Sequence, residues 1–143
     1  MAFYNTHTGE NVKTAYWFNG NYLPDGLEEI NLILRDHRTG EIKSIDPRLL
    51  DLLFTLRGEL ETNEPFHLIS GYRSAATNAL LRSISDGIAT NSLHLDGKAA
   101  DIRVPGIAVS ALRQAAVALQ GGGVGYYPRS DFVHVDIGRV RYW

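Results

Sequence analysis

Hydrophobic and polar positions follow two different periods along this chain. Apolar residues at spacings of three and four predict helices over Pro24 to about Arg38, Pro47 to about Glu61, and Val109 to Leu119. The composition of Ala75 to about Ser83 favours a fourth helix. Glycine-containing segments follow several of these stretches, as expected where helices end.

Shorter segments rich in β-branched and aromatic residues predict strands between the helices. We expect strands at Phe3–Thr8, Val12–Phe18, Phe66–Ser70, Ala99–Val104, Val124–Tyr127 and Phe132–Ile137. The first two and the last two are separated only by short turns, and short turns join antiparallel strands. The pattern therefore predicts a single α+β domain over residues 1–143, with a mainly antiparallel sheet and helices packed on one side.

Two polar segments interrupt this pattern and contain candidate metal ligands. The chain has no cysteine, so a metal would have to be bound by histidine and carboxylate side chains. His94 and Asp101 are placed to lie on two sides of a turn at Gly97 that folds a strand back on itself. His134 would complete the set from a second strand, where Asp136 shares its face because side chains alternate.

Each of these residues taken alone is at least as well explained as an ordinary core or surface residue. Their convergence favours a site, because small residues surround the first two candidates where a close-packed loop would need them; these are Ser92, Gly97, Ala99 and Ala100. Asp96 is the most credible substitute ligand. The prediction is a zinc ion bound by His94, Asp101 and His134, with the fourth position open.

Two further residues are candidates for catalysis. Asp131 precedes His134 by three residues and could act as a general base, although aspartate is also common as a turn residue. Arg73 follows the strand at Phe66–Ser70 and could reach into a cleft, where it would stabilise an oxyanion or bind a substrate carboxylate. Alternatively, Arg73 is an ordinary surface residue.

Composition excludes several other classes of protein. Of 143 residues, 44% are hydrophobic and 21% charged, which is typical of a folded domain. The net charge of −2 and the scattered basic residues argue against a nucleic acid partner. No apolar run is long enough to span a membrane, and the given sequence shows no signal peptide. Gly121–Gly123 lacks the remaining residues of a phosphate-binding loop. We expect a monomer.

The motif Ser-x-His-x-x-Gly-x-Ala-x-Asp at 92–101, followed by Asp-x-x-His at 131–134, resembles the zinc peptidases that include D-alanyl-D-alanine carboxypeptidases, VanX-type dipeptidases and some phage endolysins. The hedgehog signalling domain shares their fold. Within this group the opening segment Phe3–Glu10, Ser70–Ser74 and Phe132–Asp136 are most similar to the YcbK-like murein endopeptidases. The resemblance extends over nearly the whole chain.

This resemblance implies a zinc enzyme that hydrolyses peptidoglycan stem peptides, acting in the periplasm or otherwise exported. The cleaved bond could lie in a crosslink or at a terminal D-alanine, and a zinc-binding module without catalytic activity is a further alternative. Many relatives carry glutamate where this chain has Asp131. That difference weakens the assignment of Asp131 as the base.

Overall fold

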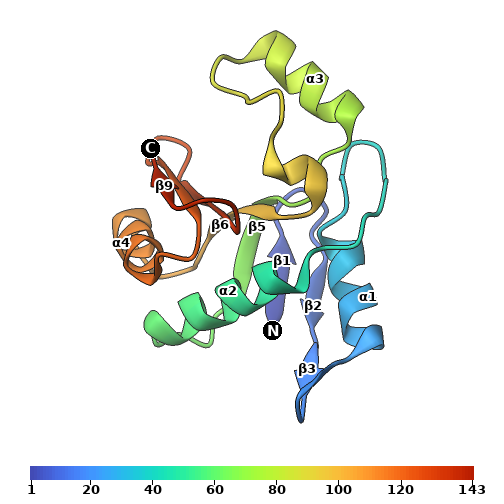
Figure 1. Ribbon diagram of the computed structural model, residues 1–143, viewed down its shortest axis with the longest axis vertical. Helices are drawn as coiled ribbons and strands as arrows, with labels where there is room; N and C mark the ends of the chain where they lie inside the picture. Colours follow the sequence, from blue (N-terminus) through green and yellow to red (C-terminus); the bar gives the residue numbers. More distant parts are fainter.

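The structure is a computed structural model that describes residues 1–143, with a central sheet and a small separate hairpin (Figure 1). The strands of the sheet are β1 (Ala2–Asn5), β2 (Asn11–Lys13), β5 (Phe66–Ser70), β6 (Ala99–Arg103), β7 (Gly123–Tyr127), β8 (Phe132–Asp136) and β9 (Arg141–Tyr142). Their order across the sheet is β2-β1-β5-β6-β8-β7-β9. The hairpin consists of β3 (Trp17–Phe18) and β4 (Asn21–Tyr22).

Most neighbouring strands of the sheet are antiparallel, which confirms the predicted α+β class. The parallel pairs are β1 with β5 and β7 with β9. Both need long connections, and the first contains two helices. The antiparallel pairs β5–β6, β6–β8 and β7–β8 form the middle of the sheet.

Four α-helices and one 3₁₀ turn complete the fold. The helices are α1 (Pro24–Ile33), α2 (Pro47–Glu59), α3 (Ala75–Ile84) and α4 (Val109–Leu119), and the 3₁₀ turn is η1 (Leu93–Asp96). A side-chain cap begins α2, where Asp46 accepts a hydrogen bond from the backbone N–H of Arg48, and Pro47 occupies the first turn. In Figure 1, α2 crosses the sheet while α3 lies at the opposite end of the molecule from the β3–β4 hairpin.

The two faces of the sheet have different roles. In β8, Val133 and Val135 point into the hydrophobic core that α1, α2 and α4 help to form, and Ile102 does so from β6. Because side chains alternate along a strand, His134 and Asp101 point to the other face. The sheet thus separates the core from the face that carries the polar candidates.

Several elements differ from the sequence-based expectations, and two of the differences are instructive. The expected strand Val12–Phe18 is divided between β2 and β3, because the chain leaves the large sheet after Lys13. The first helix ends at Ile33, before the expected Arg38. Asp36 explains the early end: its carboxylate accepts hydrogen bonds from the backbone N–H groups of Arg38 and Thr39 and so organises a turn.

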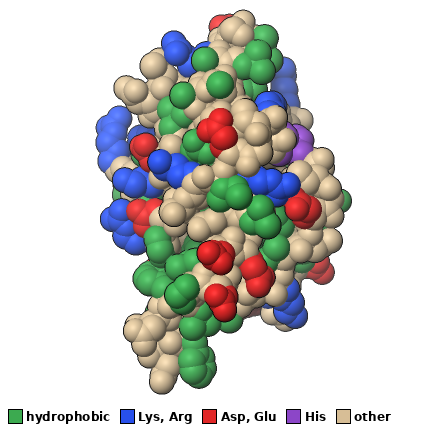
Figure 2. Space-filling view, turned by 90° about the vertical axis from the view of Figure 1, so that its right-hand side faces the viewer, with side chains coloured by type: hydrophobic (Ala, Val, Ile, Leu, Met, Phe, Trp, Pro, Cys, Tyr) green, Lys and Arg blue, Asp and Glu red, His purple; other side chains and the backbone are tan.

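Charged side chains of both signs are interspersed on the face of the molecule that carries α1 and α3 (Figure 2). This agrees with the net charge of −2. None of the helices combines the length and the apolar character that crossing a bilayer would require.

Candidate metal centre

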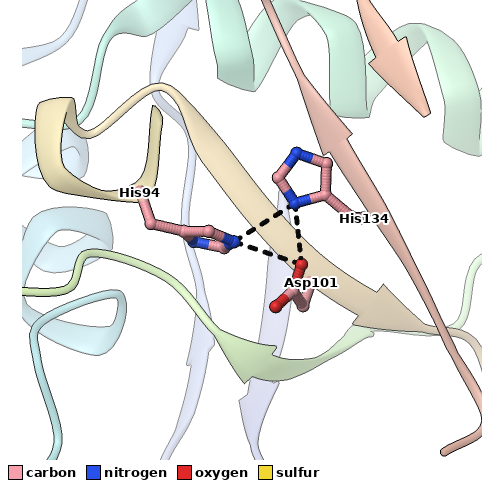
Figure 3. Close-up of side chains that lie close together, drawn as sticks. All are labelled: His94, Asp101 and His134. Carbon is pink, nitrogen blue, oxygen red and sulfur yellow. Dashed lines mark hydrogen bonds and ion pairs between the residues drawn. The ribbon is translucent and has the colours of Figure 1, made fainter. Parts of the chain in front are cut away.

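Three side chains converge on one point at the polar face of the sheet. His94 Nε2 lies 3.2 Å from Asp101 Oδ1 and 3.2 Å from His134 Nδ1, and His134 Nδ1 lies 3.0 Å from Asp101 Oδ1 (Figure 3). All three residues are buried. They form the only cluster of at least three histidine or acidic side chains in the structure with donor atoms this close.

Asp101 and His134 are direct partners across the ladder of β6 and β8. Directly opposite residues point to the same face of an antiparallel sheet, so the ladder alone brings these two side chains together. Burial disfavours a charged Asp101, yet the two histidines outweigh that effect and hold its pKa below the usual range. Asp101 is therefore anionic at neutral pH, the form in which a carboxylate can bind a metal ion.

His94 comes from η1 instead of the expected strand. Ser92 begins the turn, with its hydroxyl accepting a hydrogen bond from the backbone N–H of His94, and Gly97 ends it in the left-handed conformation (φ 67°). A Cβ at position 97 would also lie 2.7 Å from the carbonyl oxygen of Ser44. The glycine identified in the sequence is thus required, but it closes a 3₁₀ turn.

The outer nitrogen of each histidine has a hydrogen-bond partner. His94 Nδ1 lies 2.7 Å from the carbonyl oxygen of Gly71, which can only accept, so Nδ1 carries a proton and Nε2 presents a lone pair to the centre. His134 uses the opposite pair of atoms: Nε2 lies 2.7 Å from Asp136 Oδ2, and Nδ1 faces the centre. Such outer partners fix the orientation of metal-binding histidines.

Asp136 is completely buried and accepts hydrogen bonds from several donors. The Arg141 guanidinium binds both of its carboxylate oxygens, at 3.1 and 2.9 Å, and the backbone N–H groups of Gly123 and Gly138 each lie 2.9 Å from Oδ1. Burial opposes ionisation, but His134, Arg141 and these backbone groups together hold the pKa of Asp136 below its usual range. The carboxylate that orients His134 is itself fixed in place.

The geometry of the donors fits a tetrahedral metal ion. Zinc with ligands at about 2.0 to 2.1 Å separates neighbouring donor atoms by about 3.3 Å, and the donors here are 3.0 to 3.2 Å apart.

For His134, burial lowers the pKa, but hydrogen bonds with Asp101 and Asp136 outweigh burial and raise it. Burial lowers the pKa of His94, which keeps that imidazole neutral and able to coordinate.

A pocket of about 320 Å³ opens above this centre. Arg73 lines it, is largely buried, and places Nη2 3.3 Å from the Ser92 hydroxyl. Its buried Nε has no hydrogen-bond partner. Burial lowers the pKa of the Arg73 guanidinium, although arginine remains protonated at physiological pH. The residue expected in a cleft therefore lies in one, with hydrogen-bonding capacity to spare.

The structure does not bring Asp131 to this group. Asp131 lies in the turn before β8 with a left-handed backbone (φ 58°), and its side chain is 62% exposed. It faces Arg103, with 3.6 Å between Oδ2 and Nη1. Asp101 is the only carboxylate that lines the pocket. Asp96, the substitute ligand, is exposed and lies outside the metal cluster.

Comparison with known proteins places this chain in a family. A family model described as peptidoglycan L,D-endopeptidase MepK matches residues 1–143. The chain belongs to this family. It is 49% identical to peptidoglycan L,D-endopeptidase MepK of Escherichia coli strain K12 over 143 residues. The matched region covers 100% of this chain and 79% of that protein. It is 39% identical over 144 residues to the probable peptidoglycan L,D-endopeptidase MepK of Haemophilus influenzae, covering 100% of this chain and 77% of that protein.

Sequence reasoning missed several residues around the centre. Arg141 and Trp143 both line the pocket. From the sequence, no functional residue is expected in this last segment, residues 139–143. Tyr127 and Phe132 line it as well, on either side of a turn that the sequence did predict. Their aromatic character was visible, but the pairing of β9 with β7 was not.

Proposed function

We propose that this protein is a zinc-dependent murein endopeptidase that hydrolyses peptide bonds in peptidoglycan crosslinks. The observation that supports this most is the convergence of His94, Asp101 and His134 at the base of a pocket. Family membership over the whole chain gives the substrate class, since the relatives are named peptidoglycan L,D-endopeptidases. Family membership also supports hydrolysis over a purely structural metal site.

His94, Asp101 and His134 would hold the zinc ion, which would supply Lewis-acid polarisation of a peptide carbonyl group and activation of water at neutral pH. The protein side chains hold the centre in the state this chemistry needs. Gly71 and Asp136 keep the outer nitrogens of the two histidines protonated, which leaves the inner nitrogens free to coordinate. Two histidines, each neutral once the metal is bound, and one carboxylate would leave a coordination position open, as in catalytic zinc sites.

Arg73 is the group that binds negative charge on the substrate. Its guanidinium lines the pocket, and its buried Nε lacks a partner in the protein. A guanidinium can donate two parallel hydrogen bonds to a carboxylate or stabilise an oxyanion as it develops. The first role would raise KM when Arg73 is replaced, whereas the second would lower kcat.

The general base is not assigned to Asp131 on this geometry. A base must come within hydrogen-bond reach of the proton that it removes, directly or through one water molecule. Asp131 is exposed and paired with Arg103. Its sequence-based role remains a prediction that a variant can decide.

We further infer that the protein acts where its substrate is, in the periplasm, and that it works as a monomer. The first point is supported by the name of its relatives, which are called peptidoglycan L,D-endopeptidases. The support for the second is that one chain supplies all the donors of the metal cluster.

The test combines metal analysis with digestion of crosslinked murein. Purified protein should contain about one zinc ion per chain, and digestion should convert crosslinked muropeptides into monomers separable by chromatography and mass spectrometry. His134→Ala should lose both metal and activity. His67→Ala, which removes a histidine of β5 outside the cluster, should retain both.

The products separate the alternatives. Release of free D-alanine without loss of crosslinks would identify a carboxypeptidase. Full zinc content without any product would identify a binding module of the hedgehog type. Stoichiometric zinc in His134→Ala would show that the ligand set is wrong.

A further inference from the structure

The indole of Trp143 lies beside the metal centre and lines the pocket. Its ring centroid is 5.1 Å from that of His134, with an angle of 47° between the ring planes. Trp143 is 48% exposed, so the residue is not buried by the rest of the protein. No role in metal binding follows from this position, since an indole has no lone pair to donate.

Gly125 makes room for this indole. Gly125 of β7 is the direct partner of His134 in β8. A Cβ at position 125 would lie 2.6 Å from Cε2 of Trp143, which is closer than atoms can approach. Because Gly125 has no side chain, the indole can lie against the β7 backbone next to the imidazole.

Several contacts hold Trp143 in one orientation. Its backbone N–H donates to the Val124 carbonyl at 3.1 Å, and its own carbonyl accepts from the Tyr126 N–H at 2.9 Å. The indole Nε1 donates to the Tyr127 hydroxyl at 2.8 Å, and the Arg141 guanidinium lies 5.0 Å from the ring centroid. The exposed ring is therefore ordered before any ligand arrives, which reduces the entropy cost of binding.

Trp143 is part of an aromatic wall with Tyr127 and Phe132, whose rings stack at a centroid distance of 4.7 Å. This wall comes from the β8-β7-β9 side of the sheet, whereas Arg73 follows β5. In the strand order Asp101 of β6 lies between them, and His134 shares β8 with Phe132. The pocket thus has an aromatic side, which Arg141 of β9 also lines, and a side lined by Arg73, with the candidate metal centre in the middle.

We propose that Trp143 determines substrate specificity: its indole face, with the rest of the aromatic wall, packs against the aliphatic side chain of a residue next to the scissile bond. This inference rests on the proposed function, because it concerns a substrate peptide bound at the metal centre. Aliphatic groups gain affinity from burial against an aromatic face. Because the indole is preorganised, the gain appears mainly as a lower KM.

The experiment compares wild-type protein and Trp143→Ala on defined crosslinked stem peptides. One substrate is unmodified, and two analogues carry glycine on one or the other side of the scissile bond. For the wild type, kcat/KM should fall about 10-fold or more for one of the analogues. In Trp143→Ala the same comparison should give less than about a 3-fold difference, with normal zinc content and a raised KM for the unmodified peptide.

Controls separate specificity from structural damage. Tyr142→Ala removes the neighbouring exposed aromatic residue, which does not line the pocket, and should keep the wild-type preference. Trp143→Phe retains an apolar ring and should keep most of the preference, whereas Trp143→Gln fills space without one and should lose it. This pair decides the question even if Trp143→Ala loses metal or melts early.

Each outcome has one meaning. The proposed role of Trp143 is overturned, and the proposed function is not, by either of two results. One is an equal substrate preference in Trp143→Phe and Trp143→Gln, and the other is the wild-type preference in a well-folded Trp143→Ala. No hydrolysis of any peptide by zinc-loaded wild-type protein overturns the proposed function and this inference with it.

Discussion

The carbonyl oxygen of Gly71 accepts a hydrogen bond from Nδ1 of the metal-centre residue His94 at 2.7 Å. Position 71 tolerates no side chain, because a Cβ there would lie 2.6 Å from the carbonyl oxygen of Leu34. Gly71→Ala should therefore displace the acceptor and weaken zinc binding about 10-fold or more. Competition with a chromophoric chelator measures the change in Kd.

Gly58→Ala is the matched control for this variant. Gly58 lies in α2, and nothing is within 4 Å of the position that its Cβ would occupy. The substitution should leave zinc affinity unchanged and slightly stabilise the helix. Equal zinc affinity in both variants would rule out a supporting role for Gly71.

Asp136→Asn tests the partner of the other histidine. The amide retains an acceptor for His134 Nε2 but loses the charge that the buried pair with Arg141 requires. We expect zinc affinity to fall about 10- to 100-fold, as for other outer partners of metal ligands. Asp131→Asn removes the same charge at an exposed position and should not change the Kd. An unchanged Kd in both proteins would contradict the prediction.

Asp131→Ala decides between two roles for Asp131. A general base predicts a loss of about 10²- to 10⁴-fold in kcat with normal zinc content. The exposed position beside Arg103 predicts less than about a 3-fold loss, together with a small decrease in thermal stability from the altered turn. The geometry favours the second result. Steady-state hydrolysis of a crosslinked peptide, with zinc content measured on the same sample, distinguishes them.

Asp36 gives the protein a pH-dependent contribution to stability. This buried carboxylate accepts hydrogen bonds from the backbone N–H groups of Arg38, Thr39 and Ser74. Burial alone would raise its pKa, but hydrogen bonds from Thr77, Ser74 and Arg38 outweigh that effect and lower it. Because the pKa is lower in the folded protein, the contribution is complete above about pH 4 and is lost as the pH falls further.

Asp36→Asn should therefore reduce the free energy of unfolding at pH 7 by about 1–3 kcal/mol. The difference from wild type should narrow as the pH falls below about 4. Urea titrations across this range, with a chelator present so that metal loss affects both proteins equally, measure it. If the difference in the free energy of unfolding between Asp36→Asn and wild type did not change with pH, the charge of Asp36 would make no contribution to stability.

Much of the fold could be predicted from local patterns. The helix at Val109–Leu119 and the strand at Phe66–Ser70 have the predicted bounds, because their apolar residues follow one clear period. The bounds of the first helix were wrong because a single side chain, Asp36, organises a turn that competes with the helix.

The candidate site was predictable where alternation or a motif applied. His134 and Asp136 share a face, as alternation requires, but Asp131 lies in the turn before β8, where the backbone is left-handed and alternation does not apply. Trp143 could not have been placed, because its position depends on the pairing of β9 with β7 and on the missing side chain of Gly125.

The three candidate ligands are not held equally. Asp101 and His134 sit on paired strands in the middle of the sheet, whereas His94 sits on a short turn closed by Ser92 and Gly97. Metal release should therefore begin with His94, and its rate should be set by opening of that turn rather than by unfolding of the sheet. Substitutions at Ser92 would then change how fast zinc exchanges with a chelator more than how tightly it is bound. The time for which the ion stays bound would then depend on residues of the turn, whereas the geometry of the site would depend mainly on the sheet.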